Sequence, residues 1–218
     1  MGGDEHGGPP DGSGTTVRMG RDGDAQVAAD LHVVQISEGF LSLLGRGFLR
    51  RLYRRIVRSS SAFLLVAERQ GQVVGFVAGA VDTGALYREF VLRDGIRAGL
   101  GAAGPIFRNW RQVVETLRHG TSQGVSHGRG VELLSIAVDP DRQGQGIGRL
   151  LVDSFVDACT TTGNDSASVV VSSDNSTAIR LYEQAGFVAA TRFEMHADVE
   201  SVLMERSGSG HVHQRPPT

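Results

Sequence analysis

Apolar and polar positions follow strand periods and helix periods in turn along most of the chain. Strands are predicted at Thr16–Met19, Ala62–Arg69, Gln72–Val81, Val131–Val138, Ala167–Ser172, Phe187–Met195 and Val199–Glu205. Helices are predicted at Asp22–Ile36, Arg46–Arg58, Gly146–Thr160 and Ser176–Ala185. Asp22 is the expected N-cap of the first helix, and Gln70-Gly71 indicates a tight hairpin turn. A strand–helix–strand–helix core with antiparallel flanking strands is an α/β (α+β) fold with a mixed sheet.

Residues 83–130 interrupt this pattern just before the strand Val131–Val138. They contain two amphipathic stretches separated by the glycine-rich run GLGAAGP, which predicts a helical insertion. The first stretch is Leu86–Leu92, and the second carries Ile106, Phe107, Trp110, Val113, Val114 and Leu117. Residues 1–14 and 207–218 are rich in Gly, Pro and polar residues, so we expect disordered tails there. A single domain of residues 15–206 remains.

Composition excludes several classes of protein. The 218 residues carry 22 basic and 24 acidic side chains, so no net field recruits nucleic acid or a membrane. No signal peptide or membrane span is visible, and one cysteine, Cys159, precludes an internal disulfide. Cys159 lies in an apolar helical pattern and should be buried. His211 and His213 lack further metal ligands, so no metal site is expected. The absence of a visible signal peptide or membrane span and the single cysteine lead us to expect a cytoplasmic protein.

The most informative stretch is Leu133–Val152, LLSIAVDPDRQGQGIGRLLV. A predicted strand runs into an Asp-Pro turn, and a glycine-rich loop then opens into an amphipathic helix. Gly144, Gly146 and Gly148 have no side chain, so their backbone amides can converge on an anion. The free amides and the positive dipole end of the helix favour the same ligand. The loop therefore predicts a pyrophosphate-binding site.

Two familiar pyrophosphate-binding loops do not fit this stretch. A P-loop ends in Gly-Lys-Ser/Thr, and all 22 basic residues of this chain are Arg. The dinucleotide fingerprint GxGxxG requires a third glycine where this chain has Arg149. Both of these nucleotide-binding classes are therefore excluded.

What remains, Gln143-Gly144-Gln145-Gly146-Ile147-Gly148 after Val138 and Pro140, has the form Q/R-x-x-G-x-G/A. It resembles the acyl-CoA signature of the GCN5-related N-acetyltransferase (GNAT) superfamily. Asn175–Phe187 likewise resembles the segment N-x-x-A-x-x-L-Y-x-x-x-G-F of that superfamily. In this segment Asp174 or Asn175 can cap the helix and Gly186 can end it. The resemblance is close from Val131 to Met195 and topological from Thr16 to Val81.

The resemblance implies a mostly antiparallel central sheet flanked by helices, in which the parallel strands Val131–Val138 and Ala167–Ser172 splay apart. The pantetheine arm of the co-substrate, acetyl-CoA, would lie between them. A backbone amide near Ile136 to Val138 would polarise the thioester carbonyl as an oxyanion hole. The residues implied for binding are Ile136, Ala137, Val138, Gln143, Gly144, Gln145, Gly146, Ile147, Gly148, Arg149, Asn175 and Tyr182.

Catalytic roles are expected for Glu132 and Tyr182. An amine with a pKa near 10.4 arrives protonated, so a general base must remove its proton. Glu132 is the candidate base, and a solvated or salt-bridged carboxylate at a strand edge is the alternative interpretation. Tyr182 is the candidate acid for the departing thiolate, with an aromatic packed on the sheet as its alternative. Ser135 lacks a GxSxG elbow and a visible His partner, so direct transfer in a ternary complex is favoured over an acyl-serine.

The predicted function is N-acetyl transfer from acetyl-CoA to a primary amine of a small molecule, amino sugar or peptide. A non-catalytic acyl-CoA sensor is the alternative. Arginines crowd two segments, which suits an anionic acceptor or a membrane-surface acceptor, or only a solvated face. These arginines are Arg50, Arg51, Arg54, Arg55, Arg58, Arg88, Arg93, Arg97, Arg108, Arg111 and Arg118. Trp110 and Phe107 suggest a lid or a homodimer contact, and no nucleic-acid partner is expected.

Overall fold

The computed structural model describes residues 14–36, 44–94, 130–196 and 199–208. Its strands are β1 (Thr15–Met19), β2 (Ala62–Arg69), β3 (Gln72–Ala80), β4 (Val131–Val138), β5 (Ala167–Ser172), β6 (Val188–His196) and β7 (Val199–Arg206). Its helices are α1 (Asp24–Gln35), α3 (Gly45–Arg58), α6 (Ile147–Thr161) and α7 (Ser176–Gln184), with a 3-10 turn at Pro140–Arg142. A further helix covers residues 83–94.

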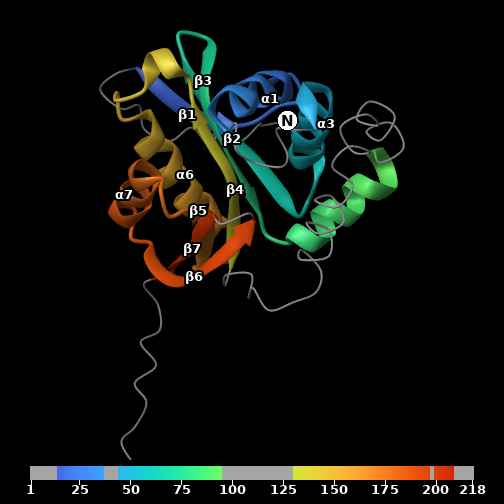
Figure 1. The fold of residues 1–218 in the computed structure, drawn as a ribbon. Helices are drawn as coiled ribbons and strands as arrows, with labels where there is room; N and C mark the ends of the chain where they lie inside the picture. Colours follow the sequence, from blue (N-terminus) through green and yellow to red (C-terminus); the bar gives the residue numbers. More distant parts are fainter. Residues whose placement is uncertain (1–13, 37–43, 95–129, 197–198, 209–218) are drawn as a thin grey trace, which may run out of the picture.

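The seven strands form one sheet in the order β1-β2-β3-β4-β5-β7-β6 (Figure 1). The pair β4–β5 is parallel and the other neighbouring pairs are antiparallel. Parallel neighbours need a long crossover connection, and here α6 supplies it between β4 and β5. The mixed, mostly antiparallel sheet expected from the sequence is therefore confirmed.

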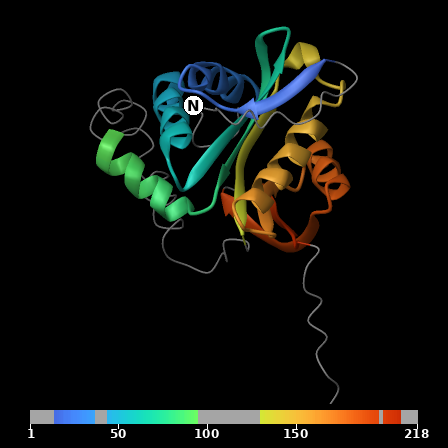
Figure 2. The same cartoon turned by 180° about the vertical axis from the view of Figure 1, so that it is seen from behind.

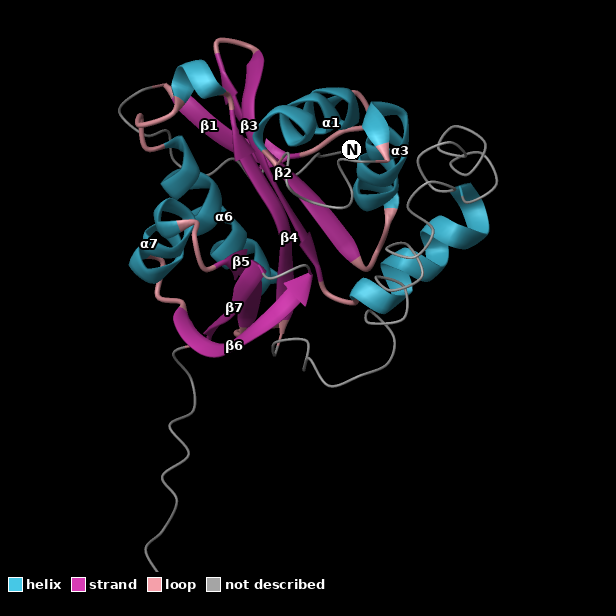
Figure 3. Ribbon diagram, viewed as in Figure 1, coloured by secondary structure: helices cyan, strands magenta, loops and turns pink. Residues whose placement is uncertain are grey.

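Helices cover both faces of the sheet, as the two opposite views show (Figures 1 and 2). Helices α1 and α3 pack on one face, where Leu49 and Phe76 belong to a shared apolar core. Helices α6 and α7 pack on the other face, where Leu151 and Tyr182 belong to a second core. Colouring by secondary structure shows the sheet lying between these helix pairs (Figure 3). Strand β4 contributes residues to both cores, so it is buried in the middle of the molecule.

The predicted elements agree with the structure to within one or two residues. The β2–β3 hairpin turns at Gln70 and Gly71, whose φ angles of 52° and 75° suit a tight turn. One cap prediction is wrong, because α1 begins at Asp24 and its N-cap is Gly23. Asp22 instead forms an ion pair with Arg58 of α3. Its carboxylate therefore connects the start of α1 to α3 and does not cap α1.

The insertion is described in part. Its first predicted amphipathic stretch lies within the helix of residues 83–94, where Leu86 and Phe90 are buried against the α1–α3 core. The second stretch, with Phe107 and Trp110, lies outside the described residues, as do most of the two predicted tails. No helix in the described part of the chain is long and apolar enough to cross a membrane.

Candidate active site

Strands β4 and β5 run side by side only at their beginnings. The ladder pairs Val131 with Ala167, Glu132 with Ser168 and Leu133 with Val169, and it ends there. Beyond these pairs β5 continues to bond β7 as far as Ser172, while β4 continues to bond β3 as far as Val138. The sheet therefore opens between the second halves of β4 and β5, and the splayed strands implied by the family resemblance are confirmed.

A β-bulge changes the side of the sheet to which the β4 side chains point, directly after the last residue of β4 that pairs with β5. Ala78 pairs with Ser135 and Gly79 pairs with Leu133, so Leu134 has no partner of its own on β3. An extra residue in one strand shifts the alternation of side chains by one position. Leu134 and Ser135 consequently both lie on the α1–α3 side, whereas Ile136 packs on the α6 side. The bulge thus places a hydroxyl where regular alternation would turn it toward the other face.

The glycine-rich loop ends directly at the first turn of α6. Gly144 and Gly146 have φ angles of 73° and 82°, a left-handed conformation that strongly favours glycine. Gly146 is the N-cap of α6 and, having no side chain, makes no cap hydrogen bond to the first-turn amides. The amides of Ile147, Gly148 and Arg149 precede the first intrahelical bond, so they remain available to a ligand. Such an uncapped helix start is suited to a phosphate.

Neighbouring side chains hold this loop from outside. The Gln145 side chain accepts a hydrogen bond of 2.6 Å from Nη1 of Arg69. The Gln143 amide donates to the side chain of Gln35 over 2.9 Å. Arg149 pairs with Asp153 one turn along α6, with 2.7 Å between Nε and Oδ2. The loop is therefore tied to β2 and to the end of α1, and its exposed backbone is left for a ligand.

Helix α7 meets the loop at the open end of β4. A Cβ built on Gly148 would lie 3.6 Å from Leu181 and 3.9 Å from Val138, so these three predicted segments converge. Asn175 caps α7 by accepting a 3.0 Å hydrogen bond from the amide of Ala178. This confirms Asn175 over Asp174 as the cap. Its side-chain NH₂ group is not needed for the cap.

Tyr182 is buried on α7 beside Phe187, with 5.8 Å between the ring centroids. Burial raises the pKa of the Tyr182 hydroxyl well above its usual value, so the phenol keeps its proton at neutral pH. The ring also belongs to the α6–α7 core. The ring therefore packs in the core, and a protonated phenol at this position is compatible with the predicted role as an acid.

A cavity of about 110 Å³ lies on the opposite side of β4. Residues of four elements line it, namely α1, α3, the helix of residues 83–94, and β4. Its lining consists of His32, Leu52, Tyr53, Ile56, Leu86, Tyr87, Glu132, Leu134 and Ser135. The carboxylate of Glu132 accepts a 2.6 Å hydrogen bond from the hydroxyl of Thr83. Leu134 and Ser135 belong both to this lining and to the bulge where the sheet opens.

Three polar side chains are joined in a line at this cavity. Nδ1 of His32 lies 2.6 Å from the Tyr53 hydroxyl, which lies 3.0 Å from the Ser135 hydroxyl. Burial lowers the pKa of His32 to about 4 and raises that of Tyr53, so both side chains are neutral at pH 7. Sequence reasoning missed His32 and Tyr53, because helical spacing marked Tyr53 only as an apolar position and gave no signal for His32.

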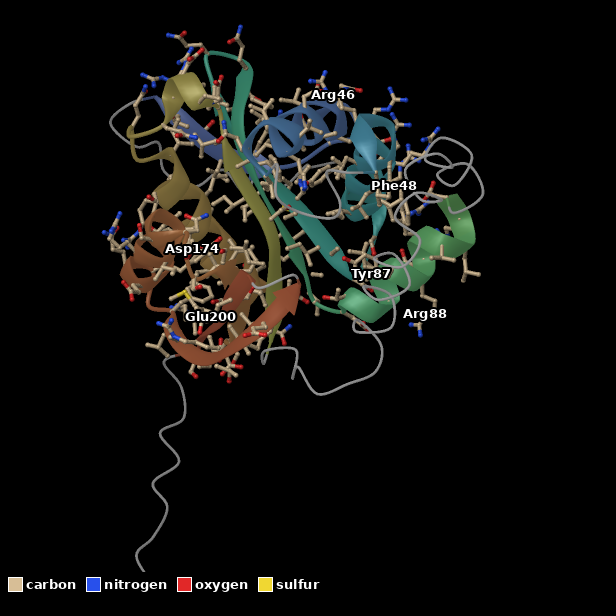
Figure 4. All side chains as sticks on the ribbon, in the orientation of Figure 1. Arg46, Phe48, Tyr87, Arg88, Asp174 and Glu200 are labelled. Carbon is tan, nitrogen blue, oxygen red and sulfur yellow. The ribbon has the colours of Figure 1, made fainter. Side chains whose placement is uncertain are left out.

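The arginines of α3 lie outside this cavity. Arg46 and Arg58 pair with Asp30 and Asp22, and Arg55 pairs with Asp94. Figure 4 shows Arg46 and Arg88 at the outer edge of the molecule. No arginine of the described residues lines the cavity. The α3 arginines that pair with carboxylates, exposed at Arg46 and Arg58 and buried at Arg55, therefore match ion-paired helix positions more closely than an anion-binding wall.

No cluster of His, Cys, Asp or Glu within the described part of the chain has the arrangement of a metal site. His211 and His213 lie outside those residues. Cys159 is buried, as expected, and burial raises the pKa of its thiol to about 12.

Comparison with known proteins identifies the family. Residues 35–187 match the model of the acetyltransferase (GNAT) family. The match covers more than half of the chain and includes the opened strands, the glycine-rich loop and α7. The chain therefore belongs to the GNAT family.

Curated relatives match over a shorter stretch. The [ribosomal protein bS18]-alanine N-acetyltransferase of Salmonella typhimurium is 44% identical over 59 residues, which are 27% of this chain and 40% of the relative. The mycothiol acetyltransferase of Beutenbergia cavernae is 39% identical over 56 residues, 26% of this chain and 19% of the relative. The matched region thus spans less than half the length of either relative.

Solved structures share the fold over most of the chain. The acetyltransferase yncA of Salmonella typhimurium, solved with acetyl-CoA, has a TM-score of 0.60 and 17% identity, covering 91% of this chain and 96% of its own. The ribosomal-protein-S18-alanine N-acetyltransferase of Escherichia coli has a TM-score of 0.56 and 18% identity, covering 93% and 99%. At this identity the likeness concerns the fold.

Proposed function

We propose that this protein transfers the acetyl group of acetyl-CoA to a primary amine, with residues 15–206 acting as one catalytic domain. The observation that carries the proposal is the opening between β4 and β5 beside an uncapped, glycine-rich helix start. The opening suits an extended thiol arm, and the helix start suits the pyrophosphate at the other end of that arm. Membership of the GNAT family supports the same combination.

In this proposal the backbone of Gln143 to Arg149 binds the pyrophosphate, since the amides of Ile147 to Arg149 need acceptors. Backbone groups of Ile136, Ala137 and Val138 bind the arm. The side-chain NH₂ of Asn175 is free to donate to the arm, because the cap uses only its oxygen. The loop and α7 converge at Gly148, so these groups can contact one extended ligand.

The amine enters from the α1–α3 side, through the cavity whose lining includes Leu134 and Ser135. Its nitrogen attacks the thioester carbonyl carbon, the C–N bond forms, and the C–S bond breaks with its electron pair left on sulfur. An amide near Ile136 to Val138 stabilises the charge that develops on the carbonyl oxygen. Glu132, directly or through water, takes the proton from the amine. Tyr182 gives a proton to the sulfur.

A covalent acyl-serine is not part of this proposal. The Ser135 hydroxyl contacts Tyr53 and reaches His32 only through it. An imidazole whose pKa is about 4 is a weak base at neutral pH. Two relatives carry names that specify an alanine of a ribosomal protein and mycothiol, and an amine on a peptide or small molecule is the corresponding acceptor class for this chain.

The first test is calorimetric titration of acetyl-CoA into the full chain, followed by measurement of CoA thiol release with a library of primary amines. Stoichiometric binding and amine-dependent thiol release are expected. Binding without release for any amine would leave a non-catalytic acyl-CoA sensor as the function. Failure of the folded protein to bind acetyl-CoA would overturn both functions.

Amines with and without a phosphate group, assayed at two salt concentrations, test the charge of the acceptor. With arginines absent from the described cavity lining, we expect the phosphorylated amines to show no advantage. A phosphorylated amine that reacts faster, with an advantage that falls at high salt, would instead indicate an anionic acceptor bound by arginines.

A further inference from the structure

The wall of the acceptor cavity contains the hydroxyl of Ser135, which two buried side chains hold in position. Ser135 Oγ lies 3.0 Å from the Tyr53 hydroxyl, and Tyr53 lies 2.6 Å from Nδ1 of His32. Tyr53 and His32 are only 2% and 3% exposed, so neither can move without repacking the core. The line therefore holds one polar atom, Ser135 Oγ, at the β4 bulge where the sheet opens.

Ser135 can accept a hydrogen bond whichever way its bond to Tyr53 runs. A hydroxyl has one proton and two lone pairs. If Ser135 donates to Tyr53, both lone pairs remain; if it accepts from Tyr53, one lone pair and the proton remain. In each case an ammonium or amine N–H entering the cavity finds an acceptor at Ser135 Oγ.

A second polar group of the cavity lining, the imidazole of His32, has one ring nitrogen without a partner among the described residues. Nε2 of the buried His32 has no hydrogen bond within the described residues, and His32 is part of the cavity lining. Nε2 has essentially no accessible surface, so it is a buried unsatisfied atom of a kind that is rare in folded proteins.

The volume of the cavity between the described residues suits a small group. An engineered apolar cavity of about 150 Å³ holds benzene, which has six non-hydrogen atoms. The present cavity, of about 110 Å³, therefore has room for about four or five such atoms by the same comparison. Leu52, Ile56 and Leu86 make the remainder of the wall apolar, which favours a short hydrocarbon group beside the amine.

We propose that Ser135 is a specificity-determining residue that hydrogen-bonds the acceptor amine, with Tyr53 and His32 as its positioning residues. The acceptor class is a primary amine whose neighbouring carbon carries at most a small substituent. Glu132 lies on the same cavity wall, so its carboxylate and the serine hydroxyl approach the nitrogen from two points of β4. This inference rests on the proposed transfer reaction and adds its acceptor class.

The test uses glycinamide, alaninamide, leucinamide and phenylalaninamide, which differ in side-chain volume and carry the same reacting group. Thiol release by the native chain should give alaninamide a kcat/KM at least about tenfold above that of phenylalaninamide, since overpacking a filled site is costly. Leu86→Ala, which enlarges the cavity, should raise the leucinamide-to-alaninamide ratio. Equal rates for all four amides would overturn the size limit.

The role of Ser135 is tested by measuring the KM for the amine and the KM for acetyl-CoA separately. Ser135→Ala should raise the KM for alaninamide by about tenfold, the effect of one hydrogen bond to a charged group, with the KM for acetyl-CoA unchanged. Tyr53→Phe should have a similar effect alone and no further effect in the Ser135→Ala background. Ser154→Ala on α6 removes the same hydroxyl outside the cavity and is the matched control.

Three results would overturn the assignment. The first is an unchanged amine KM in Ser135→Ala, and the second is an equal rise in both KM values, which would indicate a structural role. The third is full additivity of the two substitutions. These failures differ from failure of the transfer reaction itself, which would abolish thiol release from the native chain with every amine while acetyl-CoA still bound.

Discussion

Two nitrogens of the Arg55 side chain on α3 contact one carboxylate oxygen of Asp94. Nη2 lies 2.6 Å and Nε lies 2.7 Å from Oδ2 of Asp94. The Arg55 side chain is 9% exposed and that of Asp94 is 24% exposed, so the pair is largely removed from water. It fastens the end of the helix of residues 83–94 to α3. That helix contributes Leu86 and Tyr87 to the cavity, so the ion pair supports one cavity wall from a distance.

Asp94→Ala should therefore weaken both the fold and the acceptor site. Removing one partner leaves a guanidinium buried without its counter-charge, which costs about 2–3 kcal/mol for a pair of this burial. Urea unfolding should show this loss, and the KM for the amine should rise with the KM for acetyl-CoA unchanged. Arg93→Ala, at the exposed neighbouring position, is the control. A change in unfolding free energy no larger than that of the control would contradict the role of the pair.

The glycine-rich loop offers a matched pair of variants at the two ends of α6. Gly146 and Gly163 have φ angles of 82° and 77° and open space where a Cβ would lie. Replacing either by Ala should cost about 1–2 kcal/mol through the left-handed backbone. Only Gly146→Ala places a methyl group at the uncapped helix start, so it should weaken acetyl-CoA binding at least about tenfold, by calorimetry. Equal Kd values for the two variants would exclude the loop as the pyrophosphate site.

Local signals explain why this half of the molecule could be predicted from sequence. The start of α6, the Asn175 cap and the left-handed Gly186, at φ 87°, each depend on residues a few positions apart. Turns and helix caps require particular residue types within that range, so they can be recognised in the amino-acid sequence. The parting of β4 from β5, by contrast, was expected only through the family resemblance, because no property of either strand alone encodes it.

The acceptor side could not be predicted in the same way. His32 and Tyr53 are 21 positions apart, and Tyr53 and Ser135 are 82 positions apart. They meet because α1 and α3 pack on one face of the sheet and because the bulge turns Ser135 toward that face. Asp22 illustrates the same limit, since the ion pair with Arg58 overrode its local preference for a helix cap.

Tyr182→Phe separates the packing role of this residue from its proposed chemical role. The ring and its contact with Phe187 are retained, so the unfolding free energy should change little. The kcat should fall about tenfold, because the sulfur loses its proton donor, while the KM for acetyl-CoA stays the same. Burial raises the pKa of Tyr182 above its usual value, so the native kcat should not decline between about pH 8 and 10 through ionisation of this group. An unchanged kcat in the variant would remove Tyr182 from the mechanism.

Cys159 should not react with the thiol reagent in thiol-release assays of the native protein. It is the chain's single cysteine and is 2% exposed, and burial raises the pKa of its thiol to about 12. The thiolate is the reactive form, so a chromogenic disulfide reagent should detect almost no thiol until the chain is unfolded. One thiol per chain should then appear in denaturant. Rapid labelling of the folded protein would show that α6 opens on the timescale of the assay.

His32 should make the fold sensitive to mild acid. Burial lowers its pKa to about 4 in the folded protein, against about 6.5 in an unfolded chain. Between these values the unfolded state binds a proton that the folded state does not. The stability contributed by neutral His32 is therefore fully present above pH 6.5 and is lost as the pH falls toward 4, by about 3 kcal/mol in total.

Urea unfolding of the native chain and of His32→Gln at pH 7, 5.5 and 4.5 isolates this contribution. Carboxylates elsewhere titrate in both proteins, so the difference between the two pH profiles belongs to position 32. We expect the variant to be the less stable protein at pH 7, because the hydrogen bond to Tyr53 is disturbed, and to lose less stability on acidification. Parallel profiles would mean that His32 takes up its proton without unfolding. The unpartnered Nε2 atom would then be accessible to solvent through the cavity.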